Sequence, residues 1–556
     1  MNYQHYERMP VVKLENRQWP SRIQTEAPIW CSVDLRDGNQ ALEVPMNISQ
    51  KLDFFKYLVK IGFKEIEIGF PAASKTDYEF TRRLIEDNLI PDDVSIQVLT
   101  LARESTIEET FEAVRGAKNV IIHLFNATNT IQRELVFGFN KEECKEFAIS
   151  GTRIIKEHIK KDNNGTKFVF EYSPEGFSAT EPDFAVDVCN SVLETYNPSA
   201  EDKVIINLPE TVEMSTPNVY ADQIEYFCRN IKYRDNVIVS IHTHNDRGTA
   251  IASSELGLLA GAQRIEGTLF GNGERTGNAD ITVLAINMMM LGINPKLDFS
   301  NIDEAIAVFE ENTSMSISDR HPWSGKLVFT AFSGAHQDAI KKGIDKLNQN
   351  TNDKWSVPYL PIDPKDVGRS YEPIIRINSQ SGKGGVAFIM REIFGLNLPR
   401  SFQKEFSKLI KDKSCEEDIE LQPQQIFDLF DDEYINYFNP YCLDKFREIS
   451  HEDKYSEVEA IISKGDETRR FVGHGNGFLD AFVDAVNQFP DVDVTINMYS
   501  EHSMKSGSDS AAITYIEILD KKTNTIHLGA GVSSSVTKSS VRAVISAVNR
   551  MIKAKM

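Results

Sequence analysis

The feature of the sequence that most constrains its fold is an alternation of short apolar runs with longer segments of helical period. Eight apolar runs qualify as strands: 29–33, 65–70, 94–100, 120–124, 167–172, 203–208, 237–242 and 264–269. Helix-like stretches separate them, and helical spacing resumes after the last run at 281–291. This order is typical of an α/β protein in which helices connect the strands of a parallel sheet.

Eight β/α units predict a closed (β/α)8 barrel, the TIM-barrel architecture, which typically takes about 250 residues. An open, doubly wound sheet is the alternative that the same alternation allows. The position of the polar residues favours the barrel, because barrels place their active sites at the C-terminal ends of the strands. Six polar residues lie at or just beyond such ends: Asp37, Glu171, Thr211, His242, His244 and Asn278.

Two histidines, His242 and His244, stand at the end of the seventh apolar run. Side chains repeat every two residues along a strand, so both imidazoles leave the same face and can bind one cation. The segments Asp34–Gln40 and Gly271–Asn278 follow two other runs and supply carboxylate and amide oxygens. Ligands of this mixed hardness predict a divalent metal site that accepts magnesium, manganese, cobalt or zinc.

Arg36 lies directly beside Asp37, and Gly38 allows the chain to turn out of the strand there. An arginine near a metal-bound ketone would stabilise an alkoxide that develops on the ketone. The alternative is an ion pair with Glu67 or Glu274. We interpret Arg36 as catalytic.

Beyond residue 300 the alternation stops, and helical segments surround proline-containing loops. An acidic stretch, Asp428–Glu433, precedes a final unit with strand-like and helix-like patterns. The strand-like patterns are 492–498, 510–519 and 525–529, and the helix-like patterns are 477–488 and 536–552. An α+β domain joined to a complete barrel indicates regulation or assembly.

Composition excludes several classes of protein. The 556 residues carry a net charge of -21 that is not gathered in one tail, which argues against nucleic-acid or anionic-membrane partners. Six scattered cysteines without a Cys-x-x-Cys pair indicate a reducing compartment. No leader and no apolar stretch long enough to span a bilayer are visible, so we expect a cytoplasmic protein.

Several motifs resemble those of the 2-isopropylmalate synthase family. They are Asp34-Leu-Arg-Asp-Gly-Asn-Gln40, Glu171-Tyr-Ser-Pro-Glu175, Asn207-Leu-Pro-Glu-Thr-Val-Glu-Met214, His242-Thr-His-Asn-Asp-Arg-Gly248 and Gly271-Asn-Gly-Glu-Arg-Thr-Gly-Asn278. The resemblance continues through Phe332–Ile340, Val357–Asp363, Gly473–Phe482 and Gly529–Ser535. Barrel motifs alone leave homocitrate synthase, citramalate synthase and lyase relatives open, whereas the later motifs favour the long form with a leucine-binding domain.

The resemblance implies four domains. They are an N-terminal extension (1–28), a catalytic TIM barrel of the pyruvate carboxyltransferase type (29–305), helical linker subdomains (306–430) and a C-terminal regulatory domain that binds leucine (431–556). It also implies a homodimer with leucine as feedback inhibitor of leucine biosynthesis.

The implied reaction is the condensation of acetyl-CoA with 3-methyl-2-oxobutanoate (2-oxoisovalerate) and water to give 2-isopropylmalate and CoA. Asp37, His242, His244 and Asn278 match the family's metal ligands, with magnesium the expected ion. Arg36 matches an oxyanion-stabilising arginine and Glu171 an acid near the acetyl group. Thr211 matches a contact to the keto-acid carboxylate, and Glu274 is assigned to substrate binding with Thr211 and Arg36.

A base must remove a methyl proton from the thioester, and it must lie within hydrogen-bond reach of that proton. His336, with Tyr359 as its partner, is our candidate. Both residues lie in the linker region, and the resemblance implies that they reach the active site of the neighbouring subunit.

Two other functions remain as alternatives. A lyase or carboxyltransferase could use the same metal barrel, but carboxyl transfer should need a lysine carbamate and no lysine stands among the strand-end motifs. A catalytically silent amino-acid sensor is disfavoured because the Arg36, Asp37, His242, His244 and Asn278 set is intact.

Overall fold

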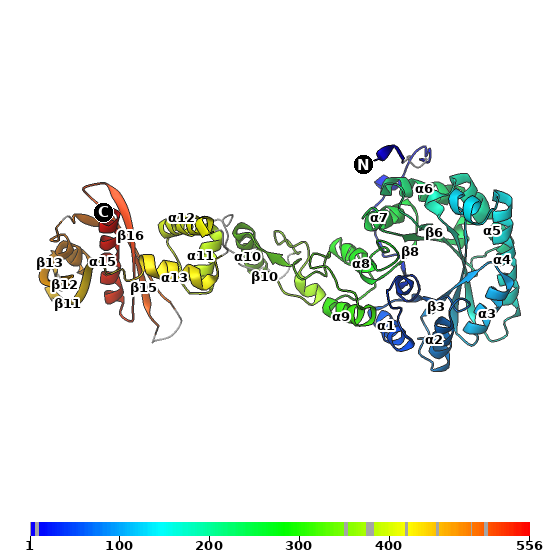
Figure 1. The fold of residues 1–556 in the computed structure, drawn as a ribbon, viewed down its shortest axis with the longest axis horizontal. Coiled ribbons are helices and arrows are strands. Elements are labelled where there is room, and N and C mark those ends of the chain that lie inside the picture. The colour runs from blue at the N-terminus through cyan, green and yellow to red at the C-terminus, as the bar shows by residue number, and fades with distance from the viewer. Residues whose placement is uncertain are drawn as a thin grey trace. The chain divides into compact units, whose positions relative to one another are not determined.

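The computed structural model describes most of the chain as two compact units (Figure 1). One unit comprises Met1–Phe329 with Ile362–Ser370, and the other comprises Thr330–Pro361 with Tyr371–Met556. The described residues are 2–5, 11–349, 354–373, 383–417, 421–451, 455–490, 492–504 and 510–555.

The first unit is built on a closed barrel of eight parallel strands that follow one another in sequence order. The strands are β1 (Ile29–Ser32), β2 (Glu65–Gly69), β3 (Ser95–Leu101), β4 (Asn119–Ala127), β5 (Lys167–Glu175), β6 (Val204–Glu210), β7 (Val237–Thr243) and β8 (Arg264–Gly267). Pairing of β1 with β8, with Trp30 opposite Ile265, closes the ring. Each predicted strand is present, and the barrel is confirmed over the open sheet.

The barrel helices form an outer layer around the strands (Figure 1). They are α1 (Ile48–Ile61), α2 (Lys75–Glu86), α3 (Glu104–Val114), α4 (Lys141–Lys161), α5 (Pro182–Tyr196), α6 (Pro217–Asn230), α7 (Ala250–Ala260) and α8 (Ile281–Met290). Local sequence sets their ends. Asn47 and Gln50 form a capping box at the start of α1, and Gly62 ends that helix with a φ of 114°.

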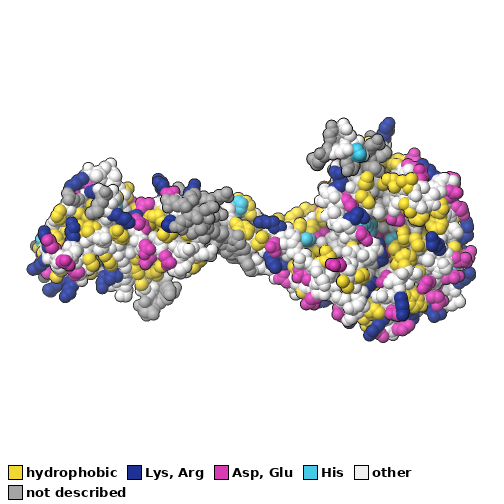
Figure 2. Space-filling model, in the orientation of Figure 1, with side chains coloured by type: hydrophobic (Ala, Val, Ile, Leu, Met, Phe, Trp, Pro, Cys, Tyr) yellow, Lys and Arg dark blue, Asp and Glu magenta, His cyan; other side chains and the backbone are white. Residues whose placement is uncertain are grey.

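The face of the first unit seen in Figure 2 carries acidic and basic side chains interspersed with one another. Helix α9 (Ile302–Thr313) packs on α1 in the same unit. No helix of the described residues is long and apolar enough to cross a membrane.

The second unit begins with short elements: β9 (Thr330–Ala331), α10 (Gly334–Gln349) and β10 (Glu372–Pro373). Three helices follow: α11 (Lys383–Glu392), α12 (Arg400–Glu417) and α13 (Pro423–Tyr434). Aromatic residues of α12 and α13 share one core with two later strands, and Phe402 meets Tyr515 at a centroid distance of 5.2 Å. This core spans the predicted domain boundary at residues 430/431.

The C-terminal part consists of two similar arrangements of three antiparallel strands and one helix. The first contains β11 (Tyr441–His451), β12 (Tyr455–Lys464), β13 (Glu467–Gly475) and α14 (Phe478–Val486). The second contains β14 (Val494–Ser503), β15 (Ala512–Asp520), β16 (Thr525–Ser533) and α15 (Val536–Lys555). The predicted α+β domain is confirmed, but sequence reasoning missed the first three strands, because charged side chains interrupt their apolar pattern.

Glycines explain why the two arrangements pack alike. Gly473 and Gly475 lie on β13 against α14, and Gly529 and Gly531 lie on β16 against α15. A Cβ atom at any of these positions would collide with backbone atoms of the helix. These glycine-rich segments are therefore contacts between strand and helix, not turns.

Candidate metal centre and active site

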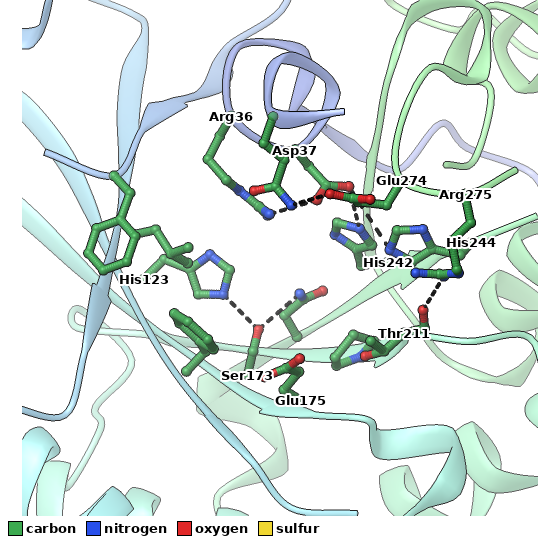
Figure 3. A pocket seen from close by; sticks show the side chains of 16 residues that line it. Arg36, Asp37, His123, Ser173, Glu175, Thr211, His242, His244, Glu274 and Arg275 are labelled. Carbon is green, nitrogen blue, oxygen red and sulfur yellow. Dashed lines mark hydrogen bonds and ion pairs between the residues drawn. The ribbon is translucent and has the colours of Figure 1, made fainter. Parts of the chain in front are cut away.

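The C-terminal mouth of the barrel holds a cavity of about 370 Å³ (Figure 3). Its walls come from loops and strand ends that are far apart in the sequence. The lining residues are Arg36, Asp37, Gln40, Phe70, Leu99, His123, Phe125, Ser173, Glu175, Asn207, Pro209, Thr211, His242, His244, Glu274 and Arg275.

Asp37 and Asn278 meet at one side of this cavity. Asp37 lies in a π-helical turn, Asp34–Gly38, directly after β1. Its Oδ2 accepts a hydrogen bond of 2.7 Å from the Asn278 amide, which also donates to the Asn272 carbonyl at 3.0 Å. A β-bridge joins Asn278 to His244. The turn and the bridge thus bring three predicted ligands to one place.

The two histidines complete the group. His242 Nε2 lies 3.6 Å from Asp37 Oδ2 and 2.9 Å from Asn278 Oδ1, while His244 Nε2 lies 4.0 Å from the same aspartate oxygen. Asp37, His242 and His244 each offer one ligand atom, and these three atoms lie within 4.8 Å of one another. All four side chains are buried. The carboxylate, amide and imidazole donors fit a divalent cation.

Glu266, on β8, orients His242. Its Oε2 accepts a hydrogen bond from His242 Nδ1 at 2.9 Å, which leaves the lone pair of a neutral His242 on Nε2, the atom facing Asp37 and Asn278. His244 has a buried Nδ1 with no hydrogen-bond partner among the described residues. The second imidazole is therefore held by its backbone bridge rather than by a carboxylate.

The charges of Asp37, His242 and His244 influence one another's pKa values. Burial opposes ionisation of Asp37, but Arg36 and His242 hold the pKa of its carboxyl well below the usual range. Burial also opposes the charge of His242, yet Asp37 and Glu266 raise its pKa to about 9. Burial and the neighbouring His242 lower the pKa of His244 to about 4. The site therefore holds an ionised carboxylate and one neutral imidazole.

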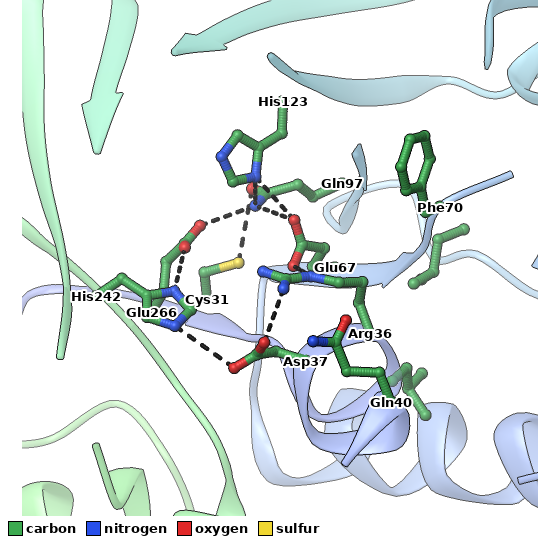
Figure 4. A network of polar contacts seen from close by, with 12 residues as sticks. Cys31, Arg36, Asp37, Gln40, Glu67, Phe70, Gln97, His123, His242 and Glu266 are labelled. Atoms are coloured by element: carbon green, nitrogen blue, oxygen red, sulfur yellow. Dashed lines mark hydrogen bonds and ion pairs between the residues drawn. The ribbon is translucent and has the colours of Figure 1, made fainter. Parts of the chain in front are cut away.

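Arg36 forms an ion pair and also lines the cavity. Its Nε pairs with Glu67 at 2.5 Å, which is one of the two ion pairs considered as alternatives. Its Nη1 also donates to Asp37 at 2.8 Å, and the side chain lines the cavity (Figure 4). Glu67 therefore fixes the guanidinium in place beside the candidate metal ligand Asp37.

Thr211 and Glu274 both line the cavity. The hydroxyl oxygen of Thr211 accepts a hydrogen bond of 2.9 Å from the Gly176 backbone, and its carbonyl accepts one of 2.6 Å from Arg275. Glu274 accepts a hydrogen bond of 3.2 Å from Gln40. Arg275, which sequence reasoning missed, is thereby placed next to Thr211 as a second arginine of the cavity wall.

Glu171 does not belong to the cavity wall. It is buried in the barrel interior with Arg264 and Glu266, and burial raises its pKa well above the usual range. Its carboxyl group could form a second cation site with His123 and Glu266 by distance, but Arg264 already supplies the positive charge there. Glu175, four residues later on β5, lines the cavity instead.

His123, Ser173, Glu175 and Asn207 are cavity residues that sequence reasoning did not identify. They lie on the strands β4, β5 and β6, which the sequence predicted correctly. His242 is predicted because it is a polar residue toward the C-terminal end of an apolar run. The same criterion could have identified these four residues.

His336 and Tyr359 belong to the second unit. Their rings stack at a centroid distance of 4.0 Å with an interplanar angle of 22°. Tyr359 is 62% exposed and has a φ of 63°. The two side chains therefore form one exposed aromatic pair, and its approach to a barrel cavity stays a prediction.

Comparisons with known protein families match three parts of the chain. Residues 27–308 match the HMGL-like family, residues 326–391 match a family described as alpha-isopropylmalate synthase, post-catalytic domain-like, and residues 420–552 match the LeuA allosteric (dimerisation) domain.

Curated relatives match the chain from end to end. A 2-isopropylmalate synthase of Acetoanaerobium sticklandii is 55% identical over 99% of this chain and 97% of its own. Those of Clostridium acetobutylicum and Helicobacter hepaticus are 53% and 50% identical over 99% of this chain, and over 99% and 100% of their own lengths. Homology over the whole length, together with a cavity lined by Arg36, Asp37, His242 and His244 and with Asn278 hydrogen-bonded to Asp37, establishes that the chain belongs to the 2-isopropylmalate synthase family.

Proposed function

We propose that this protein condenses acetyl-CoA with 3-methyl-2-oxobutanoate and hydrolyses the thioester, releasing 2-isopropylmalate and CoA. This reaction is the first committed step of leucine biosynthesis. The observation that carries the proposal is the end-to-end identity of 55% with a protein named for this activity. Homocitrate synthase and citramalate synthase are the alternatives on the same scaffold, and they differ in the 2-oxo acid that they use.

We propose that Asp37, His242, His244 and Asn278 hold a divalent cation, with magnesium preferred over manganese, cobalt or zinc. Bound there, the cation would act as a Lewis acid toward the keto acid. The support is the fit of the donor set, with Glu266 directing the lone pair of His242.

The side chains around this group have separate roles in the proposal. Arg36, fixed by Glu67, donates to the oxygen that becomes negative as the carbon–carbon bond forms. Thr211 and Glu274, which line the same cavity, bind the keto acid. Glu171 stabilises the network beneath the cavity rather than touching the acetyl group, because it is absent from the cavity wall.

His336 and Tyr359 are proposed to remove the proton from the acetyl methyl group. Their stacked, exposed pair is suited to contact a substrate held by another surface. The proposal places the pair at the barrel of a second subunit, which requires a homodimer. The match of residues 420–552 to a domain described as allosteric and dimerising supports this assembly, and it supports leucine as the ligand of the C-terminal domain.

Release of CoA thiol, followed with a chromogenic thiol reagent across a panel of 2-oxo acids, tests the proposed function. We expect 3-methyl-2-oxobutanoate to be used far better than pyruvate or 2-oxoglutarate. One methylene in an apolar pocket changes the transition-state energy by only about 1–3 kcal/mol, so 2-oxobutanoate should be a poor substrate rather than a rejected one. Preference for 2-oxoglutarate would indicate a homocitrate synthase, and preference for pyruvate a citramalate synthase.

A further inference from the structure

Lys51, near the start of α1, is a fully buried lysine to which the proposed reaction gives no role. Its ammonium group donates to the Leu35 carbonyl at 2.8 Å, to the Ile68 carbonyl at 3.3 Å and to Asp77 Oδ1 at 2.5 Å. An ammonium group carries three N–H donors, so these three acceptors use all of them. Lys51 does not line the cavity, and it therefore has no donor left for a substrate.

Stability alone does not explain a lysine at this position. Moving an ammonium group out of water costs free energy that one ion pair often fails to recover, and apolar side chains can replace buried ion pairs with little loss of stability. The Phe80 ring centroid lies 5.3 Å from Lys51 Nζ, so an apolar side chain would find an apolar neighbour there. What the lysine adds is a set of directed hydrogen bonds.

The two carbonyl acceptors lie beside the two members of one ion pair. Leu35 directly precedes Arg36 in the π-helical turn after β1. Ile68 directly follows Glu67 on β2. Arg36 Nε pairs with Glu67 Oε2 at 2.5 Å (Figure 4). Lys51 therefore links the two backbone segments from which the partners of this pair extend.

Asp77 extends the same link to the end of β2. It lies in the first turn of α2, where the helix N-terminus favours a carboxylate, and its Oδ2 accepts a hydrogen bond of 2.9 Å from the Phe70 backbone. Gly69 approaches so closely that a Cβ atom there would lie 2.6 Å from Asp77 Cγ. The ion pair of Lys51 and Asp77 thus joins the turn after β1, the end of β2 and the start of α2.

Stabilisation of an oxyanion depends on the position of the donor, since a displacement of about 1 Å can lower a rate about 100-fold. We propose that Lys51 is a positioning residue for Arg36, and this inference rests on the proposed function. Lys51 holds the backbone beside both Arg36 and Glu67, so that the guanidinium reaches the oxygen that becomes negative as the carbon–carbon bond forms. Asp77 holds the ammonium group in place.

The candidate metal ligands have support that does not depend on Lys51. Asp37, in the same turn as Arg36, accepts a hydrogen bond of 2.7 Å from Asn278. His242 is oriented by a carboxylate on β8. Loss of Lys51 should therefore lower the rate of condensation while the metal affinity stays nearly unchanged.

The test is a double-mutant cycle on the full-length enzyme with magnesium, produced in a host that lacks its own 2-isopropylmalate synthase. Product is measured by mass spectrometry at saturating acetyl-CoA and 3-methyl-2-oxobutanoate. We expect Lys51→Met to lower kcat by about 10- to 100-fold, and Arg36→Ala to lower it by about 100- to 1,000-fold. In the Arg36→Ala background, Lys51→Met should lower kcat by less than about threefold more, because the group through which it acts is gone.

Asp77→Asn is the second variant, in case Lys51→Met does not fold without a donor to the two carbonyls. It keeps the shape of the side chain but removes the charge that holds the ammonium group. Its smaller loss of kcat should likewise vanish in the Arg36→Ala background. Lys60→Met is the matched control, because Lys60 lies on the same helix but is exposed and pairs with Glu304 on α9. It should keep kcat within about twofold of the wild type.

A purely structural role for Lys51 would lower kcat by the same factor in both backgrounds, and that result would overturn the inference. Unchanged kcat in folded Lys51→Met would do so too, as would a fall in magnesium affinity, measured by calorimetric titration, as large as the fall in kcat. Wild-type enzyme that forms no 2-isopropylmalate would instead overturn the proposed function, and the inference with it.

Discussion

Glu266→Gln should weaken metal binding without removing any metal ligand. Glu266 Oε1 accepts hydrogen bonds from Gln97 at 2.8 Å and Arg264 at 3.0 Å, and Oε2 accepts from His242 Nδ1 at 2.9 Å. In the variant, Arg264 should retain the remaining oxygen, which leaves the new NH₂ group facing His242. A neutral His242 must then carry its proton on Nε2, the nitrogen that should bind the cation.

The expected loss of metal affinity follows from this change of the His242 tautomer. Removing the partner that orients a metal-binding histidine typically lowers metal affinity by about 10- to 100-fold, or about 1.4–2.8 kcal/mol. Isothermal titration of magnesium or manganese into metal-free protein measures the change, and a thermal melt checks that the barrel is folded. Turnover should recover at high metal concentration.

Glu65→Gln is the control for the loss of charge beside Arg264. Glu65 pairs with Arg264 Nε at 2.6 Å, so the control removes an ion pair from the same arginine but leaves the contact between Glu266 and His242. We expect its metal affinity to stay near that of the wild type. Equal affinity losses in both variants, or an unchanged affinity in Glu266→Gln, would refute the argument from histidine orientation.

Three further outcomes are expected. Asp37→Ala and His242→Ala should each abolish turnover in folded protein, and chelator treatment should do the same reversibly; activity in verified metal-free enzyme would contradict this. His336→Ala should lower kcat by about 100- to 10,000-fold with little change in keto-acid binding, and mixing it with Asp37→Ala should restore activity in heterodimers; no recovery after proven subunit exchange would place His336 in its own chain's site. Leucine should inhibit in a graded way without competing with 3-methyl-2-oxobutanoate, as a coupling free energy of about 1–3 kcal/mol implies; direct competition in initial-rate measurements would place leucine in the barrel.

The core shared by α11, α12, α13, β15 and β16 decides how the regulatory domain can be studied. Truncation near Glu433 would remove Tyr515 and Leu528 from contact with Phe402 and Phe430, exposing an aromatic core. A point change such as Gly531→Ala is more selective, because its Cβ would collide with the backbone of α15. It should reduce leucine sensitivity while the barrel unit stays folded.

The sequence predicts the barrel well because its strands are buried on both faces and read as continuous apolar runs. Every residue of β6 (Val204–Glu210), for example, is buried. The sequence also predicts Asp37, His242 and His244, because each of them lies at or just beyond the end of such a run. Strands β11 to β13 are harder to find, because only alternate positions are buried, as in β12, where Val458 lies between Glu457 and Glu459.

Sequence reasoning could not predict the polar contacts inside the barrel. Glu171 lies in the middle of β5 and Glu175 at its end, so Glu175 lines the cavity while Glu171 lies beneath it; the apolar pattern alone does not show where the strand ends. The contacts of Glu67 with Arg36 and His123 join β2 to β4 and to the turn after β1, so no local pattern reveals them. Such long-range polar contacts become visible only once the barrel closes.

Carbon-13 NMR of the product tests the central claim most directly. The full-length enzyme is freed of metal and incubated with acetyl-CoA labelled on the methyl carbon and with 3-methyl-2-oxobutanoate, with or without magnesium. We predict that the label appears in the methylene carbon of 2-isopropylmalate only when the metal is present. Label found only in acetate, or 2-isopropylmalate formed without a divalent cation, would contradict a metal-dependent condensation at Asp37, His242, His244 and Asn278.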